Sequence, residues 1–342
     1  MPIRDLKLWS PEHPYLYSLE VSTARDAVKV RFGMRSFRFD PRTGRAVFNG
    51  KIYYLRGTNV CIFRFFEDER RSEKPWNRKW VTKLHRAFKS MHWNSIRYCI
   101  GFPPELWYEV ADEVGFLIQD EYPIWYLGKR NWPLELKAED LAREYSLWLR
   151  ERWNHPCVVI WDAQNESVTK GITAKAIKMV RSLDLSNRPW DNGWDPPVED
   201  TDLVEAHPYL FIRGWAGNPS FKMEELENMN GRPALRSSQK GGRNCILINE
   251  YGWLWLNRDG SPTYLSRNIY KKLLGPQSTA EQRRELYARY LAALTEFWRC
   301  HRQCAGVLHF CGLTYSRAGD KPIPQGGATS DNFLDIEKLK FE

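Results

Sequence analysis

The segment CVVIWDAQNES (157–167) decides the fold of this chain, because an apolar run there leads directly into a polar tail that contains Glu166. A second segment of the same kind, CILINEYG (245–252), leads into Glu250. Short apolar runs such as these are typical of strands buried on both faces of a parallel sheet. In a parallel barrel the carboxyl ends of the strands converge on one face, where active sites lie. We therefore expect the two glutamates to meet in one pocket.

Strand-like runs alternate with stretches of helical period on both sides of these segments. This alternation predicts an α/β fold, a closed (β/α)8 TIM barrel over residues 41–342 whose last helix, after the polar loop 314–332, is short or missing. The predicted strands are 52–57, 95–99, 116–120, 157–161, 189–192, 203–207, 245–249 and 306–310. The predicted helices are 77–91, 104–114, 138–153, 172–183 and 278–302, the last with a capping box of Ser278 and Glu281.

Residues 1–40 have a different pattern. PYLYSLEVS (14–22) and VKVRFGMRSFRFD (28–40) alternate apolar and polar positions, as half-buried strands do. The region is too short to form a domain alone. We interpret it as the last strands of a β-sandwich that began upstream.

A pair of glutamates at one face of a barrel predicts hydrolysis of a glycosidic bond. Cleavage with retention needs a proton donor and a nucleophilic carboxylate about 5–5.5 Å apart. Asn165, directly before Glu166, is expected to bind the sugar hydroxyl next to the reacting carbon. One isolated glutamate in such a place is more often a solvated strand-end residue. The recurrence of the same setting at Glu250 favours the catalytic interpretation.

Composition limits the other possibilities. The 342 residues carry a formal net charge of +9, with basic residues spread over helix-like segments, which favours solvated helix faces over a polyanion site. No nucleic-acid motif is recognisable. Aromatic residues make up 14% of the chain and serve equally as core fillers or sugar platforms. The candidates for such a platform are Trp125, Trp161, Trp253 and Trp255.

The seven cysteines form no C-x-x-C pair and have no zinc spacing, so we expect reduced thiols that serve as small apolar residues and no metal site. The N-terminus lacks the apolar core of a signal peptide, and no run of 18 apolar residues exists. We expect a soluble chain of the cytoplasm or periplasm that has no membrane contact and can form an oligomer.

At the level of motifs the chain resembles the family 2 glycoside hydrolases, which include β-galactosidases, β-glucuronidases and β-mannosidases. The resemblance rests on six segments in the same order, over about residues 8 to 312: LWSPEHPYLYSLEV (8–21), VRFGMRSFRFD (30–40), FNGKIYYLRGTN (48–59), NSIRY (94–98), HPCVVIWDAQNES (155–167) and INEYG (248–252). It implies an immunoglobulin-like sandwich before the barrel and a retaining mechanism that needs no cofactor.

Residue by residue, the resemblance implies that Glu166 is the acid/base and Glu250 the nucleophile. Tyr209 is similar to the family's aromatic residue near the nucleophile, and Asp120 with Glu121 to an architectural DE segment. Arg97 is expected to support the charge of the nucleophile. The remaining candidates around the sugar are Asn165, His207, Trp253 and His309.

The chain departs from the family pattern in three segments. It has GTNVCIFRFFED (57–68) in place of GxNxHE, CIGFPP (99–104) in place of SHYP, and HFCG (309–312) where a Trp is usual. These positions shape the pocket around the sugar. A carbohydrate is the expected partner, and β-galactosides are the favoured substrates.

Two alternatives remain open. The net charge favours a β-glucuronidase or another exo-glycosidase on acidic polysaccharide, and Asn268 with Lys271 lies where glucuronidases place an Asn/Lys motif, with a spacing that differs by one residue. The apparent lack of the family's N-terminal domains instead favours a carbohydrate-binding remnant without catalysis.

Overall fold

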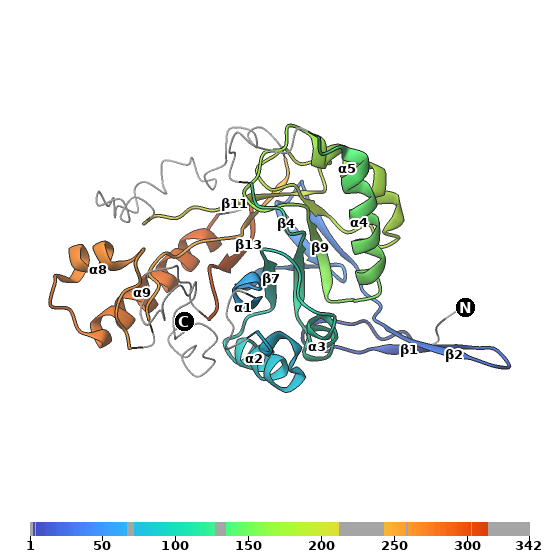
Figure 1. The fold of residues 1–342 in the computed structure, drawn as a ribbon, viewed down its shortest axis with the longest axis horizontal. Coiled ribbons are helices and arrows are strands. Elements are labelled where there is room, and N and C mark those ends of the chain that lie inside the picture. The colour runs from blue at the N-terminus through green and yellow to red at the C-terminus, as the bar shows by residue number, and fades with distance from the viewer. Residues whose placement is uncertain are drawn as a thin grey trace.

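The protein is described here by a computed structural model, which describes residues 3, 5–66, 72–126, 135–211, 243–257, 259–301 and 303–313. Its central feature is a sheet of eight parallel strands with the order β10-β9-β8-β7-β6-β13-β12-β11 (Figure 1). The other neighbouring strands are consecutive in the sequence, and β13, the last strand, pairs with β6, the first strand of this sheet, so that the strands form a ring. The predicted TIM barrel is confirmed.

The barrel strands begin and end close to the predicted positions, with one exception. They are β6 (Leu55–Cys61), β7 (Ser95–Cys99), β8 (Leu117–Glu121), β9 (Val158–Asp162), β10 (Trp190–Asp191), β11 (Leu203–Ala206), β12 (Cys245–Ile248) and β13 (Cys304–His309). The exception is the first strand, because the predicted range 52–57 combines the end of β5 (Lys51–Tyr53) with the start of β6. β6 runs to Cys61 beside β7, and Gly57 allows this close approach: a Cβ there would lie 1.7 Å from the carbonyl oxygen of Ser95.

The ring is open at one seam. Among the described residues no backbone ladder joins β10 to β11. A side chain bridges the seam instead, since the backbone N–H of Trp190 in β10 donates to Oδ1 of Asp202, directly before β11, at 2.9 Å. This bond satisfies a backbone group that a closed ladder would have paired.

Helices cover the outside of the ring (Figure 1). They are α1 (Phe63–Phe66), α2 (Arg78–Ser90), α3 (Leu106–Val114), α4 (Ala138–Arg152), α5 (Ile172–Val180), α8 (Arg267–Leu274) and α9 (Ala280–Arg299), with 3-10 turns at Lys74–Trp76 and Arg181–Leu183. Five agree with the predicted helices, whereas α1 and α8 were not predicted. The expected short last helix lies outside the described residues. Aromatic side chains fill the layer between helices and sheet, as in the contact of Trp148 with Trp161 at 4.9 Å.

Three antiparallel strands close the end of the barrel at which the parallel strands begin. They are β3 (Phe37–Asp40), β4 (Arg45–Phe48) and β5. Arg45 donates to the carbonyl oxygen of Cys304, the first residue of β13, at 2.8 Å, and the thiol of Cys245, the first residue of β12, donates to the carbonyl oxygen of Asp40. The floor of the barrel is therefore covered, and the strand ends with the glutamates lie at the other end.

A separate hairpin, β1 (Tyr17–Ser22) and β2 (Ala27–Phe32), extends away from the barrel (Figure 1). Residues 37–40 do not pair with it but with β4, so the predicted division at residue 40 runs between two paired strands. The N-terminal segment is attached near α3, where the indole of the fully buried Trp9 donates to the carbonyl oxygen of Asp112 at 2.9 Å.

Candidate active site

Glu166 lies four residues beyond the end of β9, with its side chain 16% exposed. Its backbone φ of 43° falls in the left-handed region, which non-glycine residues rarely adopt outside turns and functional sites. Oε2 accepts a hydrogen bond from the indole Nε1 of Trp125 at 3.2 Å, and Oε1 lies 3.0 Å from Nδ1 of His207. The carboxylate is therefore held on both oxygens while part of it faces solvent.

Glu250 lies two residues beyond β12 and is buried. Arg97 donates to its Oε1 at 2.8 Å, and the hydroxyl of Tyr209 donates to its Oε2 at 2.5 Å. Burial raises the pKa of the Glu250 carboxyl, and the neighbouring charge of Glu166 adds to this, against the opposing effects of His207 and Arg97. The predicted contact with Arg97 is present, but it does not outweigh burial.

His207 lies between the two glutamates. Its Nδ1 is 3.0 Å from Oε1 of Glu166 and 3.5 Å from Oε2 of Glu250, and its Nε2 is 2.8 Å from Oε2 of Glu205. Burial lowers the pKa of His207, but the charges of Glu205 and Glu250 raise it well above its usual range, so the ring is an imidazolium that donates from both nitrogens.

One donor atom each from Glu166, His207 and Glu250 lies within 4.8 Å of the others. Such spacing suits a metal ion as well as a hydrogen-bonded group. In the described structure, His207 has a hydrogen-bond or ion-pair contact to Glu166 through Nδ1 and to Glu205 through Nε2. The two carboxylates thus share one neighbour, because Nδ1 of His207 lies within 3.5 Å of an oxygen of each.

Arg97 holds the site together from below. Its side chain is fully buried, and the surrounding carboxylates keep its pKa well above the usual value although burial opposes them. Besides Glu250, the guanidinium contacts Asp162 Oδ2 at 2.9 Å, Asn165 Oδ1 at 2.8 Å, Asn59 Oδ1 at 3.3 Å and a carboxylate oxygen of Glu121. One residue thus positions the nucleophile candidate together with the amide next to Glu166.

More carboxylates lie in the same buried network. Amide groups join them: Gln119 donates to Asp162 at 2.8 Å and to Asp191 at 3.0 Å, while Asn249 donates to Asp191 at 2.9 Å and to Glu205 at 3.0 Å. Burial, then repulsion from Glu205 and Asp162, raises the pKa of Asp191 well above its usual range. Burial also raises the pKa of Glu205, but His207 reverses this and lowers it to about 2. The buried network therefore combines carboxyl groups whose pKa is raised with one, Glu205, whose pKa is lowered.

The structure brings most of the predicted site residues together. Asn165 uses its Oδ1 on Arg97, and among the described residues its Nδ2 makes no hydrogen bond, so this amide N–H group remains for a ligand. Trp253 is half-buried and packs against Tyr209, with ring centroids 4.9 Å apart, while its Nε1 donates to the carbonyl oxygen of Leu265 at 3.1 Å. It supports Tyr209 from behind.

His309 differs from its predicted place. Its Nε2 lies 2.7 Å from the hydroxyl of Tyr287 on α9, and its side chain is 1% exposed. Because successive side chains of a strand point to opposite faces, a residue at the end of β13 can face the helices instead of the barrel lumen. Burial lowers the pKa of His309 to about 3. His309 is therefore a neutral, buried residue of the layer between the barrel strands and the surrounding helices.

The four tryptophans proposed as a platform also separate. Trp125 is 42% exposed beside Glu166 and packs near Phe63, with ring centroids 6.4 Å apart. Trp161 and Trp255 are fully buried, each with its indole N–H bound inside the protein. Trp125 is therefore the one of the four that offers an exposed face next to the acid/base candidate.

Sequence reasoning missed several members of the network, namely Asn59, Gln119, Asp162, Asp191, Glu205 and Asn249. A signal was present, because each is a polar residue in or directly after an apolar strand-like run. Such residues are costly to bury unless they are paired, which makes them candidates for an internal network.

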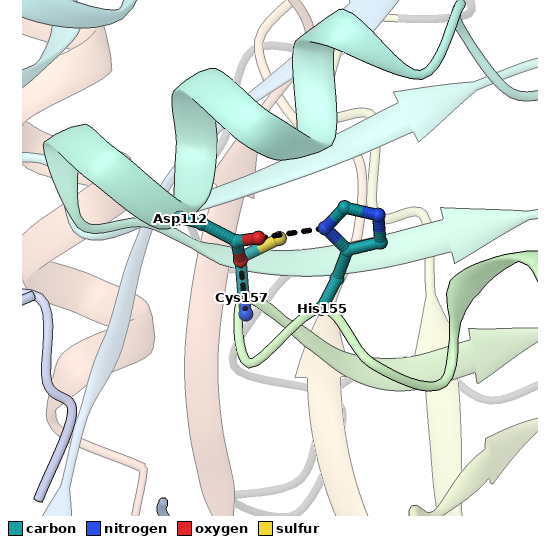
Figure 2. Close-up of side chains that lie close together, drawn as sticks. All are labelled: Asp112, His155 and Cys157. Carbon is teal, nitrogen blue, oxygen red and sulfur yellow. Dashed lines mark hydrogen bonds and ion pairs between the residues drawn. The ribbon is translucent and has the colours of Figure 1, made fainter. Parts of the chain in front are cut away.

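A second cluster, Asp112, His155 and Cys157, lies at the start of β9, at the opposite end of that strand from Glu166 (Figure 2). His155 Nδ1 is 2.6 Å from Asp112 Oδ2, and its Nε2 is 2.6 Å from Glu105 Oε1. The backbone N–H of Cys157 donates to Asp112 Oδ1 at 2.9 Å. These bonds fasten α3 to the start of β9, so we assign the cluster a structural role.

Comparison with known proteins decides the family. Residues 41–263 match the family model described as "Glycosyl hydrolases family 2, TIM barrel domain", and residues 1–35 match the one described as "Glycosyl hydrolases family 2". The chain belongs to glycosyl hydrolase family 2. The match to the barrel model covers more than half of the chain, which confirms the resemblance inferred from the motifs.

Individual relatives within family 2 are more distant. The chain is 29% identical to a β-galactosidase of Oenococcus oeni over 266 residues, 73% of this chain and 24% of that protein. It is 32% identical to a β-galactosidase of Lactococcus lactis over 224 residues, 60% of this chain and 21% of that protein. The chain thus spans about a fifth to a quarter of the length of these relatives.

A solved structure shows the same fold. The β-glucuronidase of Ruminococcus gnavus superimposes with a TM-score of 0.68 at 18% identity, over 90% of this chain and 52% of that one.

The remaining residues named from the sequence lie outside the immediate site or at its edge. In the barrel of this chain, Glu121 faces Arg97, while Asp120 turns outward and accepts hydrogen bonds from Tyr108 at 2.6 Å and from Trp148 at 2.7 Å. Asn268 and Lys271 lie on the exposed face of α8.

In the described part of the chain, no helix has the length and apolar character needed to cross a membrane.

Proposed function

We propose that this chain is the catalytic barrel of a retaining β-glycosidase that hydrolyses terminal β-linked sugars. The observation that carries the proposal is the pair of carboxylates, Glu166 and Glu250, with oxygens within 4.8 Å of each other at the strand ends. Retaining enzymes place their two carboxyl groups about 5–5.5 Å apart, whereas inverting enzymes leave roughly 6.5–9.5 Å for a water molecule. The short separation supports retention.

Glu250 is proposed as the nucleophile. Its Oε1 is fixed by Arg97, and the hydroxyl of Tyr209 holds Oε2, so the carboxylate is positioned for attack on the anomeric carbon. Attack forms a bond from a carboxylate oxygen to that carbon as the glycosidic C–O bond breaks. As the negative charge of Glu250 moves into the new ester, the Tyr209 hydroxyl and Arg97 lose part of their electrostatic interaction with it.

Glu166 is proposed as the acid and then the base. It gives its proton to the leaving oxygen and, in the second step, takes a proton from the water that cleaves the glycosyl ester of Glu250. Its side chain is the more exposed of the two, at 16% against 6% for Glu250, which suits contact with both the leaving group and water. Trp125 next to it offers a face for the sugar on the leaving-group side.

β-Galactosides are the substrates proposed first, because the two relatives compared above are named β-galactosidases. A β-glucuronide or another acidic sugar is the second candidate, and the net charge of +9 favours it. The exposed position of Asn268 and Lys271 on α8 supplies no support for an acidic sugar from those two residues.

The test is hydrolysis of aryl β-D-galactoside and aryl β-D-glucuronide by the purified chain. We expect turnover of one of the two substrates, lost in Glu250→Gln and retained in Glu281→Gln, a matched change at a glutamate with an 86% exposed side chain on α9. Glu166→Gln should lower kcat by about 10²–10⁴-fold on a poor leaving group and by less on an activated one. Full activity of Glu250→Gln would contradict the proposal.

Azide separates the two roles. With Glu166→Ala, added azide should attack the glycosyl ester of Glu250 and give the β-glycosyl azide. With Glu250→Ala, azide should replace the nucleophile directly and give the α-glycosyl azide. The anomeric configuration is read by NMR, and exchanged products would reverse the assignment. Saturable sugar binding without turnover by the folded wild-type chain would instead indicate a binding protein.

A further inference from the structure

Three side chains that follow different barrel strands meet in the candidate active site. Glu166 lies beyond the end of β9, His207 directly after β11, and Glu250 beyond the end of β12. Nδ1 of His207 is 3.0 Å from Oε1 of Glu166 and 3.5 Å from Oε2 of Glu250, and one ligand atom from each residue lies within 4.8 Å of the other two. One nitrogen and two oxygen atoms are thus close enough to bind a single ion.

These separations agree with the geometry of zinc. Zinc bonds to histidine nitrogen and carboxylate oxygen are about 2.0–2.2 Å long, so ligand atoms at the corners of a tetrahedron around the ion lie about 3.3–3.6 Å apart. The two distances from Nδ1 of His207 are close to these values. An imidazole ligand suits zinc, whereas magnesium and calcium prefer oxygen ligands alone. Three protein ligands with a fourth position left for water are typical of an open zinc site.

The other nitrogen of His207 is held as a zinc ligand requires. Nε2 lies 2.8 Å from Oε2 of the buried Glu205. A carboxylate on the second nitrogen fixes the ring orientation and raises the basicity of the nitrogen that binds the metal. In Glu250, Oε1 accepts from Arg97 and Oε2 from Tyr209, and a carboxylate oxygen has a second lone pair for an ion. The ring and this carboxylate are therefore oriented before any ion binds.

We propose that Glu166, His207 and Glu250 together bind one zinc ion. The ion takes the place of the proton on Nδ1 of His207, which passes to solvent, while Nε2 keeps its proton and donates it to Glu205. No oxidation state changes in this step. Solvent reaches the site at Glu166, whose side chain is 16% exposed. None of the three ligands is a cysteine, so the spacing of the cysteines in the sequence does not bear on this site.

The cluster of Asp112, His155 and Cys157 fits zinc less well (Figure 2). Nδ1 of His155 and Oδ2 of Asp112 are in direct contact at 2.6 Å, so one tetrahedral ion could bind both atoms only if they moved apart. Asp112 and Cys157 are also buried, with 5% and 0% exposure. Zinc bound in that cluster would have a sulfur neighbour at about 2.3 Å, which distinguishes the two sites by experiment.

Zinc bound to Glu166, His207 and Glu250 would compete with sugar. The ion would lie between the two carboxylates, where the proposed mechanism places the anomeric carbon and the leaving oxygen. This consequence rests on the proposed function, whereas the binding of zinc does not. We therefore expect zinc to raise the apparent KM for an aryl glycoside and a chelator to restore the original value.

The test is titration of the purified, metal-free chain with zinc in competition with a chromophoric zinc chelator, followed by X-ray absorption of the complex. We expect one tightly bound zinc per chain, with nitrogen and oxygen neighbours only. Glu166→Gln and His207→Gln should each lower the affinity by at least about tenfold, because losing a group that merely orients a ligand already costs about that much. Glu166→Gln changes the more exposed residue and leaves the buried ring in place.

Cys157→Ser is the control, because it removes the sulfur atom of the other cluster and should bind zinc like the wild type. Circular dichroism should show that every variant folds. Wild-type affinity in folded Glu166→Gln and His207→Gln would overturn the proposal, and so would a sulfur neighbour of the bound zinc. Zinc binding without hydrolysis of either aryl glycoside would count against the proposed function and support the metal site. Unchanged turnover with the site saturated would refute the competition with sugar.

Discussion

A single guanidinium, that of Arg97, lies among four buried carboxylates: Glu121, Asp162, Glu205 and Glu250. Removing so many charges from water costs free energy, and the ion pairs with Arg97 offset this cost only if all of them are formed. The arrangement therefore serves to hold Glu250 in one position more than to stabilise the fold. Removing the cation leaves several buried acids without a counter-charge.

Arg97→Met should accordingly lower the free energy of unfolding by about 3–5 kcal/mol, because it strands the buried carboxylates. Urea unfolding at neutral pH measures the effect. Arg78→Met is the matched control, since Arg78 also contacts two glutamates but its side chain is 45% exposed. A surface pair of this kind contributes no more than about 1 kcal/mol. Equal losses in the two variants would refute this view of the network.

His155 should make the stability depend on pH. Burial lowers its pKa, but hydrogen bonds with Asp112 and Glu105 raise it to about 9, above the value of about 6.5 in an unfolded chain. A raised pKa means that the stabilisation is complete below about pH 6.5 and is lost as the pH rises through about 9. Unfolding of wild type and His155→Gln should differ by on the order of 2 kcal/mol at pH 6 and converge near pH 10. A constant difference would show that the charge of His155 plays no part.

At the scale of elements, the predictable features were those that repeat along the chain. Apolar runs and helical stripes located the barrel strands and five helices, because burial of one face imposes those periods. The error at β6 came from Ile52 and Tyr53, which belong to the antiparallel sheet but continue the apolar run of the next strand. The local sequence does not determine which neighbouring strand a β-strand will pair with.

The site was predictable in part for the same reason. Glu166, Glu250, Tyr209 and His207 follow strand ends, which a parallel barrel brings to one face. His309 also ends a strand, yet it faces α9, because inward and outward positions depend on a register that the sequence alone does not fix. The wider network depends on contacts between strands distant in sequence, such as Gln119 with Asp191.

The start of α9 gives a test at this scale. The predicted capping box of Ser278 and Glu281 is wrong by one residue, since Thr279 Oγ1 accepts from the backbone of Gln282 and the Gln282 side chain accepts from the backbone of Thr279. Thr279→Ala should cost about 1 kcal/mol in thermal or urea unfolding, the usual effect of losing an N-cap. Glu281→Ala should stay within about 0.5 kcal/mol of the wild type. A larger loss of stability in Glu281→Ala than in Thr279→Ala would instead support the capping box of Ser278 and Glu281.

At the scale of the whole molecule, the strands of the barrel are buried under helices, whereas the β1–β2 hairpin is exposed. The hairpin extends from the barrel, and Leu19, Val21 and Val28 are 44–61% exposed on it (Figure 1). Two strands alone are marginally stable in water. The predicted sandwich would bury such a surface, and the division of the chain at residue 40 stays a prediction.

Hydrogen exchange should reveal this contrast. Backbone amides of residues 17–32 should exchange at least about a hundredfold faster than those of β7, because opening the hairpin requires far less free energy than opening the barrel. Mass spectrometry of peptides from the two regions measures the rates on the same sample. Equal protection of both would mean that the hairpin is covered in solution.

Trp125 has a consequence for how ligands of this protein can be observed. Its indole is 42% exposed and bonded to Glu166, so a sugar seated there changes both the solvent and the charge around a fluorophore. Subtracting the emission of Trp125→Phe from that of the wild type isolates this signal from the other tryptophans. The change in Trp125 fluorescence then measures how much of the pocket is occupied by sugar. The measurement needs no turnover, so it works equally well with an inactive variant.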